Sequence, residues 1–316
     1  MTVSARETHL ILRAGWAPRG VDRLGPSTTL GWDVSQPIDD QELAPYMKPR
    51  SLILDLFGDY LRYADSQVKA GDLITLLGIF GVESGTVRVT LSRLRRERWF
   101  TTRRVGRETV YSLTEQMVGI LDEGRARIFA PYDEAWDHTW TTVVYQSGLE
   151  RLTRDQLRKR LSWLGFGPLS TSTWISPRHR VAEARGLGKD FTKIATTIMR
   201  STTGDLAEDR GLAERCWDLD RINELYAGFL ESHVRLLDSV NDLDGAEALV
   251  ARTSLIASYR HFPFLDPWLP TELQPEGWLG SKANSLFRVG HAALAAKACD
   301  FVASIIGTPA IAAPPE

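Results

Sequence analysis

The sequence of 316 residues predicts an α+β fold that is divided among several domains. Three observations support this prediction. Apolar residues recur at helical spacing across residues 45–96, β-branched and aromatic runs alternate with helical ones across residues 131–215, and helical spacing alone fills residues 216–307. We therefore expect a first domain over 45–130, a mixed domain over 131–215 and a helical domain over 216–307.

Composition narrows the class of protein. Hydrophobic residues make up 43% and charged residues 25% of the chain, which is typical of a soluble protein. Because no run of about 18 apolar residues and no secretory leader pattern occurs, we expect a cytoplasmic protein without membrane contact. Cys216 and Cys299 are far apart and lack CxxC spacing, which argues against disulfides and structural zinc. No metal, cofactor or catalytic residue is predicted.

Two helices with apolar faces are expected first. In PRSLILDLFGDYLRY, the apolar residues at helical spacing are Ile53, Leu56, Phe57, Tyr60 and Leu61. Ser51 is available to cap this helix. In the second segment, AGDLITLLGIF, the apolar residues at helical spacing are Leu73, Leu76, Leu77 and Phe80. Gly81 can then adopt the positive φ angle that ends a helix.

The third helix is strongly basic. Val87, Leu91 and Leu94 of GTVRVTLSRLRRERWF are expected to face inward, and Glu83 or Ser84 can cap the helix. The outward residues are Thr86, Arg88, Ser92, Arg93, Arg95 and Arg96. Eight arginines and only two glutamates lie between residues 83 and 107. Three short helices with a glycine turn before a basic third helix indicate a helix-turn-helix module, whose last helix enters the major groove.

A hairpin follows the basic helix. RWFTTRRV and TVYSLT read as strands joined by a turn at Gly106 and Arg107, which makes the module a winged helix. Near the tip, Arg103, Arg104 and Arg107 are placed to meet phosphates or a minor groove. A charge run is often only a solvated face, but its position after two core-facing helices favours DNA binding. A dimer that neutralises about eight phosphates would show a log-log salt slope of about −7.

The middle region alternates strands and helices. After a connecting helix in EQMVGILDEGRARIFA and a break at Pro131, WTTVVYQ, STSTWISP and ATTIMRS read as strands. A helix is expected in TRDQLRKRLSWLGF, where the apolar face has Leu157, Leu161 and Leu164, and another over at least part of VAEARGLGKDFTKI. The order approximates the split βαβ pattern of ferredoxin-like domains, which by analogy suggests a dimer contact. The basic helix RDQLRKR is either a solvated face or a second DNA or partner contact.

The last region is helical. In WDLDRINELYAGFLESHVRLLDSV, the apolar residues at helical spacing are Ile222, Leu225, Tyr226, Phe229 and either Leu236 or Leu237. GAEALVARTSLIASYR and ANSLFRVGHAALAAKACDFVASII supply two more helices. Between them, the aromatic and proline-rich HFPFLDPWLPTELQPEGW is expected to be a packed loop that borders a pocket. Residues 308–316 are expected to form a disordered tail, and 1–44 a flexible extension.

Five blocks in order carry a resemblance to a known family. RSLILDLFGDYLR, TVRVTLSRLRRERWF, RKRLSWLGFGPLSTSTWISP, WDLDRINELYAGFL and HFPFLDPWLP resemble the PaaX family of transcriptional repressors of phenylacetate degradation. The resemblance implies a central domain similar to Cas2 proteins, a homodimer, and release from operator DNA by an aryl-acetyl-coenzyme A thioester, typically phenylacetyl-CoA. It places the DNA helix at Thr86 to Arg96. Residues 1–44 precede the usual start of the family, near Met47.

The effector residues are less defined. Near the aromatic loop, Arg252, Arg260 and His261 could bind the phosphates of coenzyme A, and Trp268 could contact the acyl group. Alternatively, the two arginines could pair with local carboxylates such as Asp266. Three functions remain open: an effector-responsive repressor, a DNA-binding regulator with a different effector or none, and a Cas2-like metal nuclease. The nuclease would need carboxylates at a strand end, where Asp137 is the one candidate.

Overall fold

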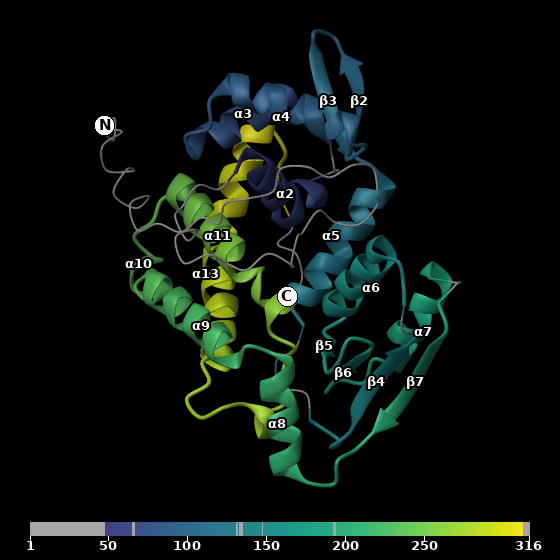
Figure 1. The fold of residues 1–316 in the computed structure, drawn as a ribbon. Coiled ribbons are helices and arrows are strands. Elements are labelled where there is room, and N and C mark those ends of the chain that lie inside the picture. The colour runs from purple at the N-terminus through teal and green to yellow at the C-terminus, as the bar shows by residue number, and fades with distance from the viewer. Residues whose placement is uncertain are drawn as a thin grey trace.

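The computed structural model describes residues 48–64, 67–130, 132, 135–146, 148–191 and 194–311. The expected extension over 1–44 therefore lies outside the described residues, as does the expected helix break at Pro131. Figure 1 shows the two sheets at different ends of the molecule, with the C-terminal helices beside both.

The first described region contains three main helices and a small antiparallel sheet. In chain order its elements are α2 (Pro49–Asp59), a 3-10 turn (Leu61–Tyr63), β1 (Gln67–Lys69), α3 (Ala70–Ile79), α4 (Ser84–Arg96), β2 (Phe100–Val105) and β3 (Glu108–Leu113). The strand order is β1-β3-β2. The short strand β1 was not expected, because its three residues stand in a polar link too short to show alternation.

Most of the predicted helix faces are confirmed. All five apolar residues chosen for the first helix are buried, although Tyr60 and Leu61 directly follow α2 rather than lie in it. The three leucines of α3 and the inward residues of α4 are also buried, whereas Phe80, the C-cap of α3, is only partly buried. Gly81 ends α3 with a φ angle of +77°. The predicted cap at Ser51 is wrong, because Lys48 is the N-cap and Pro49 begins the helix with its φ angle already suited to it. Glu83 is the N-cap of α4, without a side-chain hydrogen bond.

The connecting helix leads to a second sheet. The elements are α5 (Glu115–Ile128), β4 (Trp140–Tyr145), α6 (Arg151–Trp163), β5 (Gly167–Pro168), β6 (Thr173–Ser176), α7 (Val181–Asp190) and β7 (Thr196–Ser201). All pairings are antiparallel and the order is β5-β6-β4-β7, as a split βαβ unit requires. Leu157 and Leu161 of α6 are buried in the core of this unit, and Leu164 packs at its margin.

The remaining chain is helical, as predicted. It comprises α8 (Leu206–Cys216), α9 (Leu219–His233), α10 (Leu236–Ser239), α11 (Gly245–Tyr259), α12 (Phe262–Leu265), a 3-10 turn (Thr271–Leu273) and α13 (Gly280–Ile306). By length and composition alone α13 could span a membrane. In the structure it packs against α11 and α9, and part of its surface is buried. The aromatic loop is packed against the protein, because its residues Trp268, Leu269 and Leu273 are buried.

The first and last regions share one hydrophobic core. Leu56 of α2 and Leu76 of α3 belong to the same buried cluster as Leu249 of α11 and Val302 of α13. Ile311 also joins this cluster and is only 6% exposed, so the chain packs beyond residue 308, where we expected a disordered tail to begin. The DNA-binding region predicted over 45–130 is thus packed directly on the C-terminal helices.

Candidate nucleic-acid interface

Helix α4 turns its polar face outward. The six polar residues predicted to face outward, Thr86, Arg88, Ser92, Arg93, Arg95 and Arg96, are all exposed. Because Val87, Leu91 and Leu94 fix the opposite face in the core, the helix cannot rotate these side chains inward. Val89, which was not among the predicted outward residues, lies on the same outer surface and is 71% exposed.

Glu97 follows α4 directly as its C-cap residue. Arg93 pairs with Glu97 at 3.2 Å, and Arg50 of α2 pairs with it at 2.5 Å. Arg50 also lies over the Trp99 ring, 4.0 Å from its centroid. Among the described residues, Arg88, Arg95 and Arg96 form no ion pair, so their charge is available to an anion. Arg50 extends the basic surface and was missed because it lies on a different helix.

The hairpin β2–β3 extends the basic surface. Arg103, Arg104 and Arg107 are exposed, and Gly106 makes the tight turn with a φ angle of +61°. Arg103 donates a hydrogen bond to Oε1 of Gln67 on β1, at 2.8 Å, which orients its guanidinium. The structure thus brings the predicted arginines of the hairpin to the same end of the molecule as α4 (Figure 1).

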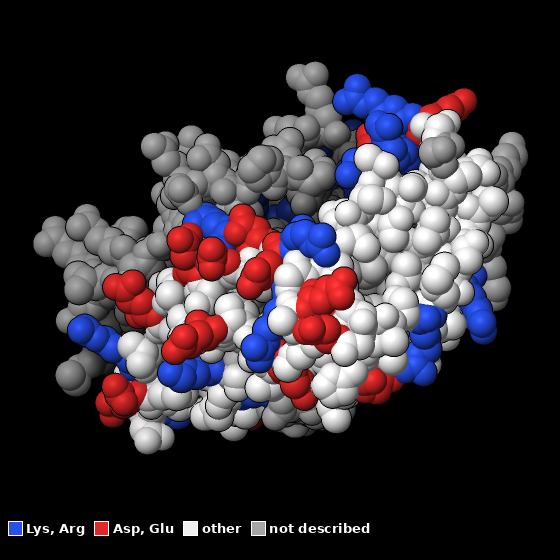
Figure 2. Space-filling model, turned by 60° about the horizontal axis from the view of Figure 1, so that its bottom comes forward, with Lys and Arg blue, Asp and Glu red and all other residues white. Residues whose placement is uncertain are grey.

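Charge is distributed differently elsewhere. In Figure 1, α4 and the hairpin lie at the top and α8 at the bottom. Figure 2 brings that bottom forward, and basic and acidic side chains are interspersed over most of this face. A surface of mixed sign does not attract a polyanion as a run of arginines does. The end that carries α4 is therefore the better candidate for nucleic-acid contact.

The four predicted effector residues have different contacts in the structure. Arg252 is 1% exposed and pairs with Asp59 at 2.7 Å, and Arg260 pairs with Asp55. Both arginines therefore pair with carboxylates of α2 rather than with Asp266. Burial, with the neighbouring Arg260, lowers the pKa of His261 to about 3, so this side chain is neutral at physiological pH.

Trp268 is held by contacts of both its backbone and its ring. Its φ angle is +56°, and its backbone carbonyl accepts a hydrogen bond of 2.7 Å from Nε of Arg178. Its ring packs edge-on against Tyr132, with centroids 4.9 Å apart. Of the four predicted effector residues, only Arg260 lines the cavity described next.

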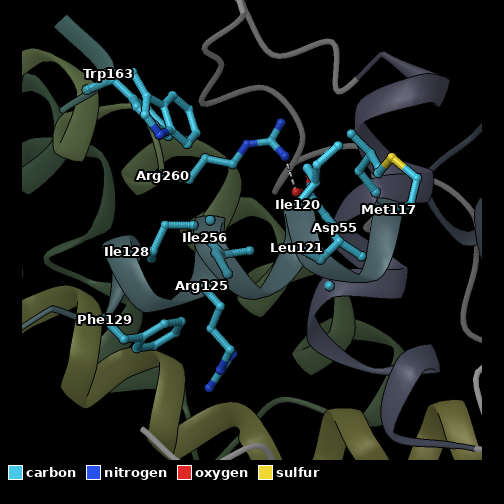
Figure 3. A pocket seen from close by; sticks show the side chains of 14 residues that line it. Asp55, Met117, Ile120, Leu121, Arg125, Ile128, Phe129, Trp163, Ile256 and Arg260 are labelled. Atoms are coloured by element: carbon cyan, nitrogen blue, oxygen red, sulfur yellow. Dashed lines mark hydrogen bonds and ion pairs between the residues drawn. The ribbon is translucent and has the colours of Figure 1, made fainter. Parts of the chain in front are cut away.

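A cavity lies where α2, α5, α6, α11 and α12 meet. It encloses about 690 Å³ of empty space, part of it open to solvent. Its walls are mostly apolar, and Asp55 and Arg260 form an ion pair at one side (Figure 3). Trp163 and Phe264 stand in this cavity, so the aromatic loop borders a pocket as expected. Sequence patterns could not find it because its walls come from distant segments.

The nuclease candidate Asp137 forms contacts within the protein. It accepts hydrogen bonds from the backbone and hydroxyl of Thr139 and pairs with Arg200 of β7. The hydrogen bonds from Thr139, together with Arg200, lower the pKa of this carboxyl. Within the described ranges, no three His, Cys, Asp or Glu residues are grouped as metal ligands would be.

Comparisons with known proteins cover most of the chain. Three family models match in order: "PaaX-like protein" at residues 48–117, "PaaX protein central Cas2-like domain" at 133–213 and "PaaX-like protein C-terminal domain" at 217–304. The chain is 31% identical over 258 residues to the transcriptional repressor PaaX of Escherichia coli K12, covering 78% of this chain and 81% of that protein. The structure is similar to an uncharacterized protein, Rv0674, from Mycobacterium tuberculosis, with a TM-score of 0.55, 21% identity, and coverage of 82% of this chain and 99% of that one. At this identity the likeness shows the fold alone.

Proposed function

The chain belongs to the PaaX family, and from this premise we propose that it is a DNA-binding transcriptional repressor of an aromatic-acid catabolic operon of the phenylacetate type. Similarity to the repressor from Escherichia coli supports a regulatory function rather than an enzymatic one. It also supports a location in the cytoplasm. The three matched ranges support the division into domains over 45–130, 131–215 and 216–307.

One observation carries the DNA-binding part of the proposal. The exposed face of α4 presents arginines and hydroxyl residues, while its other face is anchored in a core shared with α2 and α3. We propose that this region acts as a winged helix-turn-helix, with α4 in the major groove and the hairpin β2–β3 on the phosphates. Arginine suits guanine and the hydroxyls of Thr86 and Ser92 are less discriminating.

A homodimer and an effector complete the proposal. Strand β7 lies at an edge of the central sheet and exposes Met199, which makes it a suitable place for contact with a second copy. Two copies would present two α4 helices to the halves of a partly palindromic operator. We propose that an aryl-acyl-CoA thioester, phenylacetyl-CoA or another acyl-CoA, favours a dimer geometry in which both helices no longer fit, because it binds that geometry more tightly.

Fluorescence anisotropy tests this function. The protein is titrated against its own upstream DNA and against random DNA at about 150 mM salt, with phenylacetyl-CoA, free phenylacetate or coenzyme A added. We expect specific binding that only the thioester releases. Equal affinity for both DNAs would overturn the operator proposal, and specific binding that ignores all three compounds would overturn the proposed effector.

Val89 offers a prediction about sequence readout. A valine on the exposed face of a recognition helix is suited to contact the methyl group of a thymine. Replacing that thymine by deoxyuridine should weaken binding of the wild type about fourfold, since a buried methyl group contributes about 0.8 kcal/mol. The Val89→Ala variant should not distinguish the two bases at that position. A scan of single thymine-to-uracil operators by anisotropy measures this.

Val289 on α13 provides the matched control, because it is also an exposed valine in a helix, at 54%. Val289→Ala should keep the wild-type response to uracil at every position. If Val89→Ala also keeps the wild-type response to uracil at every position, Val89 makes no contact with a thymine methyl group.

A further inference from the structure

The cavity in Figure 3 joins the region with α4 to the other two regions. Leu54 and Asp55 come from α2, whose other residues pack in one core with α3 and α4. Ile120 and Leu121 come from α5, which follows the hairpin directly. Trp163 ends α6 of the central sheet unit, and the C-terminal helices complete the walls. The walls of this cavity therefore come from all three regions.

The cavity has the lining of a site for a flat apolar group. Trp163 and Phe264 stack with centroids 4.7 Å apart, and Arg127 lies over both rings. The indole of Trp163 also donates a hydrogen bond of 2.7 Å to Glu123, so this wall is fixed before any ligand arrives. The space amounts to about 690 Å³ when its part open to solvent is included, and it sits between domains, where small-molecule sites are common.

One polar atom in this wall lacks a partner. Oδ1 of Asp55 accepts from Arg260, whereas Oδ2 is buried and has no hydrogen-bond partner among the described residues. Buried polar atoms are rarely left in this condition, because each one loses its bond to water. Burial raises the pKa of Asp55 to about 6 although Arg260 opposes this, so the carboxylate gains from any additional donor. A ligand that fits must therefore place a hydrogen-bond donor near an apolar ring.

We infer that this cavity binds the acyl end of a thioester ligand, with an aromatic ring between Trp163 and the aliphatic residues of α5, and an amide N–H that donates to Oδ2 of Asp55. The inference rests on the proposed function and adds the site to it. A thioester of the pantetheine type carries an amide N–H two methylene groups beyond the sulfur. A free aromatic acid instead brings a second carboxylate towards Asp55, which repels it.

The same contacts explain how a ligand can act on α4. Asp55 lies on α2, which packs directly on α4, and the opposite walls lie on α6, α11 and α12. A ring that enters between these walls favours the arrangement in which α2 stands further from them. The ligand thus shifts the position of the DNA-contacting end by its preference for the wider cavity.

Gly124 offers a direct test. It lies within α5, lines the cavity, and a Cβ atom built on it meets no atom within 4 Å. Gly124→Leu should fill the space without a clash, and leucine is also the better helix former. Gly119 is the matched control, because it lies in the same helix, has equal room for a Cβ atom and is not part of the cavity wall. Circular dichroism checks that both variants are folded.

The probe is the phenylacetyl thioester of N-acetylcysteamine, which has the ring and the amide N–H but no nucleotide, and calorimetry measures its binding. We expect binding to the wild type and to Gly119→Leu, and at least tenfold weaker binding to Gly124→Leu. The N-methylated probe, which has no N–H, should also bind the wild type at least tenfold more weakly, and Asp55→Asn should reduce this difference. No binding to the wild type, or equal binding to Gly124→Leu, would overturn the inference.

The two proposals fail separately in this design, because anisotropy on upstream DNA is measured with the same proteins. Specific DNA binding together with probe binding that ignores Gly124→Leu would leave the repressor function and remove the cavity site. Probe binding that depends on Gly124 and Asp55, without specific DNA binding, would keep the site and remove the repressor function.

Discussion

Asp59→Asn is expected to lower the free energy of unfolding by about 3–5 kcal/mol, because it leaves buried cations without their carboxylate. Asp59 is 1% exposed at the end of α2. Arg252 pairs with it at 2.7 Å and His291 at 2.9 Å, and Arg125 approaches to 3.4 Å. These three partners come from α11, α13 and α5, so one carboxylate joins α2 to three other helices.

The pH dependence of this effect has a definite sign. Burial alone would raise the pKa of Asp59, but His291, Arg252 and Arg125 together hold it below its ordinary value of 3.8. A carboxyl group whose pKa is lowered by folding adds stability above that ordinary value and loses it as the pH falls through the folded-state pKa. The difference between wild type and Asp59→Asn should therefore be complete at neutral pH and shrink in strong acid.

Urea denaturation followed by circular dichroism measures the difference at pH 7. Asp122→Asn is the control, because Asp122 pairs with Arg62 at 2.8 Å but its side chain is 64% exposed. An exposed pair contributes less than about 1 kcal/mol. Arg252→Gln combined with Asp59→Asn should cost less than the sum of the single changes, since the unpaired charge is then removed. Equal effects of Asp59→Asn and Asp122→Asn would contradict the role of burial.

Local patterns predicted the elements because each one is encoded within a short window. The spacing of Ile53, Leu56 and Phe57 needs only one helical face, and the turn at Gly106 needs only the residues beside it. Caps are less certain in sequence, since Ser51 and Pro49 both offer a plausible start and Pro49 begins the helix. The strand β1 is defined by its pairing with β3, which no pattern within three residues reveals.

Packing between distant segments could not be predicted in this way. The pair of Asp55 and Arg260 joins residues 205 positions apart, and Asp59 and His291 are separated by 232. Nothing in a single sequence marks such partners, because each charge has several opposite charges that it could meet. The same limit explains why the proposed effector site lies in a cavity of which only Arg260 was among the predicted effector residues.

The candidate DNA-contacting face was accessible to sequence reasoning because it depends on one amphipathic helix. Once Val87, Leu91 and Leu94 are assigned to the core, the position of every other residue of α4 follows from the helical period. Val89 was overlooked because the search was for polar and charged side chains. Its exposure follows from the same geometry, so an exposed apolar residue on a basic helix is itself a signal.

The combined change Arg88→Ala and Arg93→Ala is expected to remove nearly all preference for the operator, with the fold intact. Each arginine that contacts a guanine contributes about 1–3 kcal/mol of discrimination. Arg88 should account for more of the loss, because Arg93 must first leave its ion pair with Glu97, at 3.2 Å. Anisotropy on upstream and random DNA at several salt concentrations measures both affinity and preference.

Two controls separate base contacts from general charge. Arg103→Ala in the hairpin should weaken binding to both DNAs and reduce the salt slope by about one unit per monomer, as loss of one phosphate contact does. Arg215→Ala on α8, at the other end of the molecule, removes the same charge and should change neither affinity nor slope (Figure 1). If all three variants lost affinity equally on both DNAs, the protein would bind by net charge alone, and α4 would not be a recognition helix.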